Sequence, residues 1–173
     1  LDDDQVIAIC DSAAQGDVVE AVNFNAPGQV VIAGSAAAVE RAVAEAKAAG
    51  AKRAMPLNVS VPSHCALMAP AAERLAERLR GVAIAAPVTP VIHNVDVAPC
   101  GDPDGIRERL ALQVCRPVRW AETVAYLGNQ GVDRLVECGP GKVLAGLTRR
   151  IDKRLDSQPA FDPETVAKAT GTE

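Results

Sequence analysis

Residues 18–34 read VVEAVNFNAPGQVVIAG, in which two apolar runs flank a Pro-Gly pair. Both runs, Val18–Phe24 and Gln29–Ala33, are rich in β-branched residues, which favour strands. Pro27 and Gly28 are typical turn residues, because proline presets φ and glycine tolerates a positive φ. The stretch therefore predicts an antiparallel β-hairpin.

Helical patterns flank this predicted hairpin. Apolar residues recur with a 3.6-residue rhythm over residues 4–15 and again over residues 35–50. Residues 52–59 follow as a predicted third strand. The resulting order, α-β-β-α-β, matches the split βαβ unit, β-α-β-β-α-β, except that its first strand is absent. We therefore predict an incomplete ferredoxin-like (α+β) small subdomain over residues 1–60, with Leu1 lying inside a longer chain.

Helices and strands alternate after residue 60. The predicted elements are helices at 66–80, 105–115, 118–130 and 143–153, and strands at 91–97 and 134–138, the second of them buried. This alternation indicates an α/β layer with parallel strands. We assign residues 61–155 to part of a larger α/β subdomain, and residues 156–173, which lose periodicity, to a flexible tail.

Composition argues against several classes of protein. The 173 residues carry a net charge of −4, which disfavours a nucleic-acid partner because phosphate binding needs a basic surface. No apolar run approaches the roughly 20 residues of a membrane span. The five cysteines lack CxxC spacing and only two histidines accompany them, so no metal site is expected. Dispersed thiols fit a reducing cytoplasm.

His64 is the first candidate for chemistry. It lies in the loop Ser60–Cys65, which enters a helix, and imidazole can take and return a proton near neutral pH. The alternative is a purely structural histidine. A pairing of His64 with Cys65 is disfavoured because adjacent residues at a helix start do not face each other. No serine lies in a G-x-S-x-G elbow, and His93, which alternates with valines, is interpreted as a packing residue.

Three other features allow both a functional and a structural interpretation. The Gly139–Lys142 turn before a helix could bind an anion, although a tight strand-to-helix turn explains it as well. Asn23 and Asn25 place amides around the Pro-Gly turn, and turn chemistry accounts for Asn25 without a ligand. Lys52 and Arg53 form a small basic spot, either a solvated surface or a site for an acidic partner.

Four separated segments together resemble one family. They are Asn23–Gly34, Val59–Met68, Asn94–Val97 and Glu137–Leu144. In this order and spacing they resemble the bacterial malonyl-CoA:acyl carrier protein transacylases of type II fatty acid synthesis, and the likeness extends to about Asp152. The resemblance implies an α/β hydrolase-like large subdomain with an inserted ferredoxin-like small one. It also implies an enzyme that uses malonyl-CoA as substrate and needs no cofactor.

The resemblance further implies a ping-pong acyl transfer. In the family, a serine in a G-H-S-L-G elbow attacks the malonyl thioester and releases CoA. The malonyl group then passes to the phosphopantetheine thiol of acyl carrier protein. By this resemblance His64 is the general base and acid, and Gln113 accepts the histidine's other N–H through its backbone carbonyl. That carbonyl takes the place of the carboxylate in a Ser-His-Asp triad.

Binding roles follow from the same resemblance. Asn23 and Asn25 match a segment near the substrate cleft, and Lys52 and Arg53 match positions that meet the carrier protein. The family's nucleophilic serine, malonate-binding arginine and oxyanion-hole residues lie in an N-terminal half that this chain lacks. We therefore expect the C-terminal portion of a cytoplasmic, monomeric transacylase, inactive by itself. Two alternatives stay open: a non-catalytic module that binds carrier protein, and an acyltransferase domain cut from a polyketide synthase.

Overall fold

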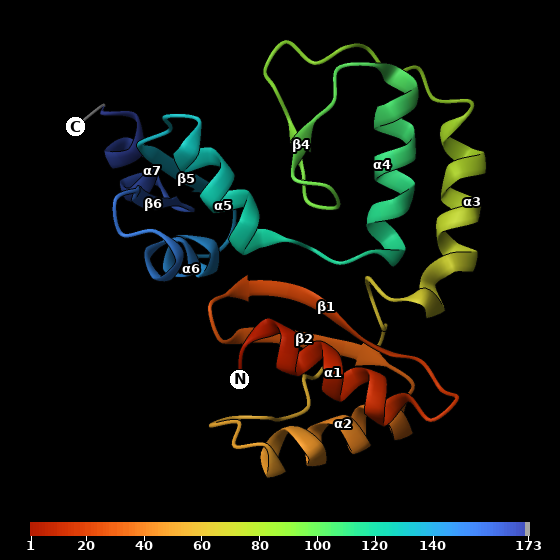
Figure 1. Ribbon diagram of the computed structural model, residues 1–173. Coiled ribbons are helices and arrows are strands. Elements are labelled where there is room, and N and C mark those ends of the chain that lie inside the picture. Colours follow the sequence, from red (N-terminus) through yellow and green to blue (C-terminus); the bar gives the residue numbers. More distant parts are fainter. Residues whose placement is uncertain (172–173) are drawn as a thin grey trace. The chain divides into compact units, whose positions relative to one another are not determined.

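The computed structural model describes residues 1–171 and divides the chain into two compact units (Figure 1). The first unit is Leu1–Arg119, and the second begins at Trp120. This division differs from the predicted boundaries at residues 60 and 155. Among residues 1–171, no helix is both long enough and apolar enough to cross a membrane.

The predicted hairpin is confirmed by two antiparallel strands, β1 (Val19–Ala26) and β2 (Gln29–Gly34). Their register runs from Val19 opposite Gly34 to Ala26 opposite Gln29. Gly28 closes the turn with φ of 71°, a conformation that glycine adopts at little steric cost. The hairpin is the part of the first unit that the sequence pattern describes most completely.

Two helices, α1 (Asp3–Ala14) and α2 (Ala36–Ala48), pack on this hairpin and on each other (Figure 1). Their shared core is built from small side chains. The buried members are Cys10, Ala13, Val19, Ala38 and Ala42. Because alanine adds only a methyl group, the two helices can approach closely without leaving a void. The small side chains at these positions therefore allow the helix pair to pack closely.

Arg41 ties the two helices together. From α2 its Nε donates to the carbonyl of Ala13 at 2.7 Å, and one Nη donates to the carbonyl of Ala14 at 2.8 Å. The same Nη contacts Asp17 Oδ2 at 2.9 Å. The last carbonyls of a helix have no partner within the helix, so this guanidinium completes the C-terminal end of α1.

Replacing Arg41 should therefore destabilise the first unit. We expect Arg41→Ala to lower the free energy of unfolding by about 2 kcal/mol, because it removes charge-assisted hydrogen bonds to partly buried carbonyls. Urea unfolding measures the loss, with the exposed Arg80→Ala as control, expected to change it by less than about 0.5 kcal/mol. Equal unfolding curves for the two variants would show that the bonds to α1 do not stabilise the unit.

The predicted third strand at residues 52–59 is wrong. This segment forms no regular element in the structure, and Met55, Leu57 and Val59 are 50%, 55% and 73% exposed. An extended segment becomes a strand only when a neighbour accepts its backbone hydrogen bonds. Among residues 1–171 no strand pairs with it. Residues 1–60 therefore show α-β-β-α where α-β-β-α-β was predicted.

The rest of the first unit carries a pair of helices side by side (Figure 1). A 3₁₀ turn, η1 (Ala66–Met68), leads into α3 (Ala69–Leu79), which packs beside α4 (Pro103–Cys115). The N-cap of α4 is Asp102, whose side chain accepts from two backbone N–H groups. These bonds, above all the one from Gly105, hold the pKa of Asp102 below its usual value.

The prediction of one continuous strand at residues 91–97 is wrong. Only β3 (Ile92–His93) and β4 (Ala98–Pro99) pair there, and the residues between them form a tight turn. Val97 adopts φ of 57°, and its N–H donates to the carbonyl of His93 at 2.9 Å. Asp96 faces Arg109 of α4 at 2.7 Å. This long-range ion pair holds the turn and is invisible to local periodicity.

The second unit is a layer of helices on a parallel strand pair. Its elements are α5 (Trp120–Asn129), β5 (Arg134–Cys138), α6 (Val143–Ile151), β6 (Asp156–Ala160) and α7 (Pro163–Thr170). Strands β5 and β6 run parallel, from Arg134 opposite Asp156 to Cys138 opposite Ala160. The α/β class is thus confirmed. The prediction that β5 is buried is wrong, because Val136 is 40% exposed.

The prediction of a flexible tail at residues 156–173 also needs correction. Residues 156–170 form β6 and α7, and Asp162 caps α7 by accepting from the N–H of Thr165 at 2.8 Å. Backbone pairing with β5 needs no apolar alternation, which is why the periodicity missed it. Residues 172–173, the rest of the predicted tail, lie outside the described residues.

Candidate functional site

His64 is held by the C-terminal end of α4. Its backbone N–H donates to the carbonyl of Val114 at 3.0 Å, and its Nδ1 lies 2.7 Å from the carbonyl oxygen of Gln113. The last carbonyls of a helix are free to accept such bonds because no later turn uses them. The structure thus brings together His64 and Gln113, 49 residues apart in sequence.

The contact with Gln113 fixes the tautomer of the imidazole. A carbonyl oxygen only accepts hydrogen bonds, so Nδ1 of His64 must carry the proton. In the neutral ring Nε2 is then an unprotonated nitrogen with a free lone pair. Since the side chain is only half-buried, that nitrogen is the ring atom suited to take a proton from another group.

The backbone at His64 is strained. Its φ is 69°, in the left-handed region that non-glycine residues rarely adopt. Such a conformation costs on the order of 1–3 kcal/mol and persists only where the surrounding contacts enforce it. The two bonds to α4 are such contacts, and they impose the orientation of the ring.

Cys65, the next residue, is a structural thiol. It is fully buried, and its Sγ donates to the carbonyl of Pro62 at 3.1 Å. Burial raises the pKa of the Cys65 thiol, which keeps it protonated and unreactive. A nucleophilic Cys65 beside His64 is therefore not supported.

The amides predicted to bind substrate lie on β1. Asn23 forms a parallel bridge with Val118, and the adjoining main chain of β1 exchanges hydrogen bonds with that residue at 2.9 and 3.0 Å. Asn25 lies at an irregularity of the β1–β2 register, just before the turn. Both side chains are half-buried. Among residues 1–171, no hydrogen bond joins either amide to His64.

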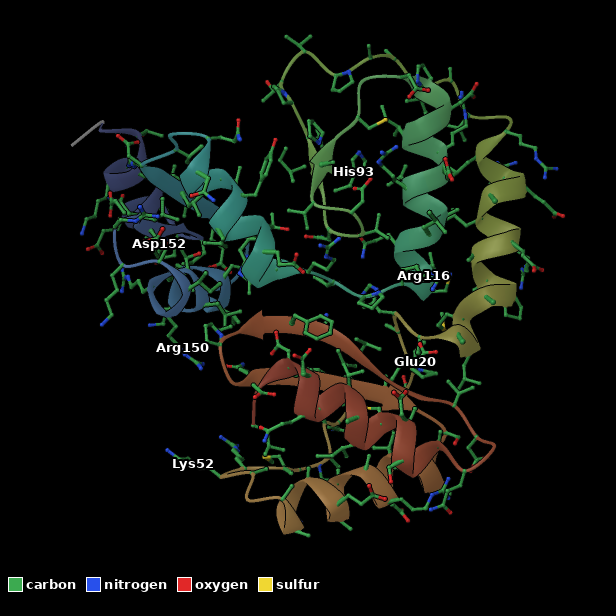
Figure 2. All side chains as sticks on the ribbon, viewed as in Figure 1. Glu20, Lys52, His93, Arg116, Arg150 and Asp152 are labelled. Carbon is green, nitrogen blue, oxygen red and sulfur yellow. The ribbon has the colours of Figure 1, made fainter. Side chains whose placement is uncertain are left out.

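Lys52 and Arg53 lie on the exposed segment that follows α2, where Figure 2 labels Lys52. Arg53 Nε contacts the sulfur of Met55 at 3.0 Å. In the described part of the chain neither cation forms an ion pair, so both charges are available to a partner. The structure does not bring them into contact with His64.

The Gly139–Lys142 turn has a structural explanation. Glu137 Oε2, at the end of β5, accepts from the backbone N–H of Ala145 in the first turn of α6 at 2.8 Å. A carboxylate of the chain itself therefore occupies the position where an anion would bind at this helix N-terminus. This favours the turn interpretation.

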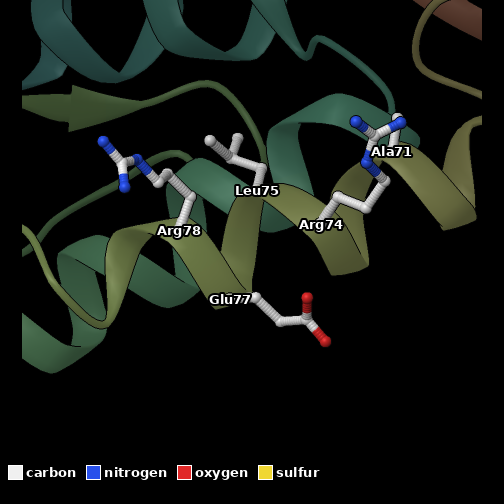
Figure 3. A pocket seen from close by; sticks show the side chains of 5 residues that line it. All are labelled: Ala71, Arg74, Leu75, Glu77 and Arg78. Atoms are coloured by element: carbon white, nitrogen blue, oxygen red, sulfur yellow. The ribbon is translucent and has the colours of Figure 1, made fainter.

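A shallow hollow of about 660 Å³ lies on α3 (Figure 3). It is lined by Ala71, Arg74, Leu75, Glu77 and Arg78, and Figure 3 shows the two arginine side chains on one side of the helix and Glu77 on the other. None of the predicted site residues lines it. Across residues 1–171 no three potential metal ligands gather together.

Comparison with known proteins gives close relatives. The malonyl CoA-acyl carrier protein transacylase of Escherichia coli (strain K12) is 54% identical over 169 residues, which is 98% of this chain and 55% of that protein. The one from Haemophilus influenzae is 58% identical over 151 residues, 87% of this chain and 48% of the relative. The chain matches about half of the length of members of the malonyl CoA-acyl carrier protein transacylase family. The resemblance stated from the sequence is thereby confirmed.

Solved transacylase structures agree with these relatives. The Burkholderia pseudomallei acyl-carrier-protein S-malonyltransferase shares 51% identity with a TM-score of 0.96, covering 99% of this chain and 56% of that one. A malonyl-transacylase in complex with a type II polyketide synthase acyl-carrier protein shares 50% identity with a TM-score of 0.98, covering 100% and 56%. This chain spans about half the length of the transacylases it matches and corresponds to their C-terminal part. No protein-family model matches it.

Sequence reasoning missed two contributors to the His64 environment. The sequence could not indicate the carbonyl of Val114 as a partner of His64, because every residue type carries the same backbone acceptor. Glu20 of β1 accepts from the backbone N–H of Ala66 at 3.1 Å, and no motif singled it out. Figure 2 labels Glu20 on β1, close to the segment that enters α3.

Proposed function

We propose that this chain supplies the general base for transfer of a malonyl group from CoA to the phosphopantetheine thiol of acyl carrier protein. The observation that carries the proposal is the 2.7 Å contact between His64 Nδ1 and the carbonyl of Gln113, which leaves Nε2 as the proton acceptor. The reaction itself is proposed from the high sequence identity to the named transacylases. The nucleophilic serine comes from residues outside these 173.

The proposed reaction has two half-reactions. In each of them Nε2 of His64 accepts one proton and then returns it. In the first, Nε2 takes the serine proton while the oxygen attacks the thioester carbonyl. The C–S bond to CoA then breaks, and Nε2 returns the proton to the CoA thiolate. In the second, Nε2 takes the proton of the carrier thiol, the thiolate attacks the serine ester, and the serine oxygen leaves and recovers the proton.

The carbonyl of Gln113 has a defined task in both half-reactions. It keeps Nδ1–H oriented while the ring is neutral, and it stabilises the imidazolium when the ring carries two protons. A carboxylate in this position would add a negative charge near the malonate group. A carbonyl orients the ring without that repulsion.

Binding roles and domain assignment form the finer part of the proposal. The α-β-β-α arrangement of residues 1–48 is consistent with a ferredoxin-like small subdomain, and the later residues with part of a hydrolase-like large one. Asn23 and Asn25 are proposed to face the substrate, and the unpaired Lys52 and Arg53 to meet the acidic carrier protein. A solved relative bound to an acyl-carrier protein supports that partner. The assembled enzyme is proposed to be a cytoplasmic monomer.

Radiolabelled malonyl-CoA tests the proposal directly. The 173-residue chain alone should acquire no covalent label, because the covalent step needs a serine in a nucleophile elbow and no serine of the chain lies in a G-x-S-x-G motif. A chimera in which this chain replaces the matching 169 residues of the Escherichia coli relative should be labelled and should pass the label to carrier protein.

Two outcomes would contradict this. Stoichiometric, hydroxylamine-sensitive labelling of the chain alone would mean that it contains its own nucleophile. A folded chimera that binds carrier protein without acquiring label would favour the non-catalytic binding module instead.

A further inference from the structure

Glu20 links the hairpin to the segment that carries His64. It lies on β1 opposite Ala33 of β2, and its Oε2 accepts from the backbone N–H of Ala66 at 3.1 Å, across 46 residues. Ala66 is the first residue of η1 and follows His64 by two positions. A side chain from the hairpin therefore fixes the main chain immediately after the imidazole.

The bond supplies a helix cap that the local sequence does not. The N-cap position of η1 is Cys65, whose side chain makes no capping bond and instead donates to Pro62. The N–H groups of a first helical turn have no partner within the helix, and a carboxylate is favoured there by charge as well as by hydrogen bonding. Glu20 therefore acts as a remote cap for Ala66.

His64 is thus fixed from two directions. On one side α4 binds its backbone and its ring through Val114 and Gln113. On the other, Glu20 holds the chain two residues later. We propose that Glu20 is a positioning residue that keeps His64 in its left-handed conformation, with Nδ1 aimed at the carbonyl of Gln113. Its effect on catalysis rests on the proposed function, whereas its effect on the geometry does not.

The charge of Glu20 also acts on the neighbouring Cys65 thiol. Burial raises the pKa of the Cys65 thiol most, and the negative charge of Glu20 raises it further. Independently of Glu20, the Cys65 thiol donates to the carbonyl of Pro62, which ties down the same loop.

Amide hydrogen exchange on the 173-residue chain tests the geometry without any activity. In Glu20→Ala the Ala66 amide should exchange about tenfold faster, the change expected from losing one charge-assisted hydrogen bond, and the His64 Nδ1–H proton signal should broaden or shift. Glu20→Gln keeps an acceptor oxygen and should restore most of the protection. Glu40→Ala, an exposed carboxylate on α2, is the matched control and should change neither signal.

The chimera tests the catalytic consequence. Glu20→Ala should lower kcat for malonyl transfer about tenfold with KM for malonyl-CoA unchanged, because misplacing the base affects the proton transfers rather than substrate binding. Glu20→Gln should recover most of kcat. Unchanged Ala66 exchange, an unchanged kcat, or a change in KM alone in Glu20→Ala would overturn the inference. An inactive unsubstituted chimera would count against the proposed function only, and the exchange measurement would still decide the role of Glu20.

Discussion

The His64→Asn form of the chimera should transfer malonyl at least about 100-fold more slowly than the unsubstituted chimera, the usual scale for loss of a general base. Asparagine is the informative replacement because His64 has φ of 69°, and asparagine is among the residues that tolerate this region best. The substitution therefore removes the imidazole while sparing the backbone. An alanine variant would combine the loss of the base with the cost of the left-handed conformation.

The other histidine of the chain is the matched control. His93 lies in β3, and within residues 1–171 its Nε2 is buried without a hydrogen-bond partner. His93→Gln should keep the transfer rate within a few-fold. The single-turnover rate of labelling with malonyl-CoA separates acylation from carrier-protein binding. Equal acylation rates in the His64→Asn and unsubstituted chimeras would remove the base assignment.

The parts of the site that the sequence could predict are those with a side-chain signature. His64 stands in a loop that enters a helix, and the hairpin that carries Asn23 has β-branched runs on either side of a Pro-Gly turn. Gln113 is different, because its contribution is a backbone carbonyl that any residue would supply. Only the family resemblance pointed to it. Glu20 has neither kind of signal, since its partner is a backbone N–H 46 residues away.

The failed secondary-structure predictions share one physical cause. Residues 52–59, which were predicted to form a strand, have no neighbouring strand to pair with among residues 1–171. Residues 156–160 have little such pattern, yet they pair with β5. In both segments the decisive quantity is the availability of a backbone partner, which a local pattern does not contain. The turn at Asp96 is likewise held by a distant partner, because Arg109 lies on α4. A local pattern does not contain that contact.

Gly34→Ala should be the most destabilising small substitution in the hairpin. A Cβ at this position would lie 2.6 Å from the Cα of Val19 and closer still to the carbonyl oxygen of Val18. Both are backbone atoms, which cannot turn aside as a flexible side chain can. The same Val18 carbonyl accepts from the N–H of Ser35 at 2.8 Å, so moving it would also break the entry into α2.

We expect Gly34→Ala to lower the free energy of unfolding by about 3 kcal/mol, the upper end of ordinary overpacking, as measured by urea unfolding. Gly101→Ala is the control, because a Cβ there meets nothing within 4 Å, and it should change stability by less than about 0.5 kcal/mol.

Gly34→Ala also tests the link between the hairpin and the candidate site. Val19 precedes Glu20, so a displacement of this part of β1 should accelerate exchange of the Ala66 amide as well. Unchanged stability in Gly34→Ala would mean that the strands do not approach as closely as the structure shows. A destabilised hairpin with normal Ala66 exchange would mean that Glu20 keeps its contact independently of the strand that carries it.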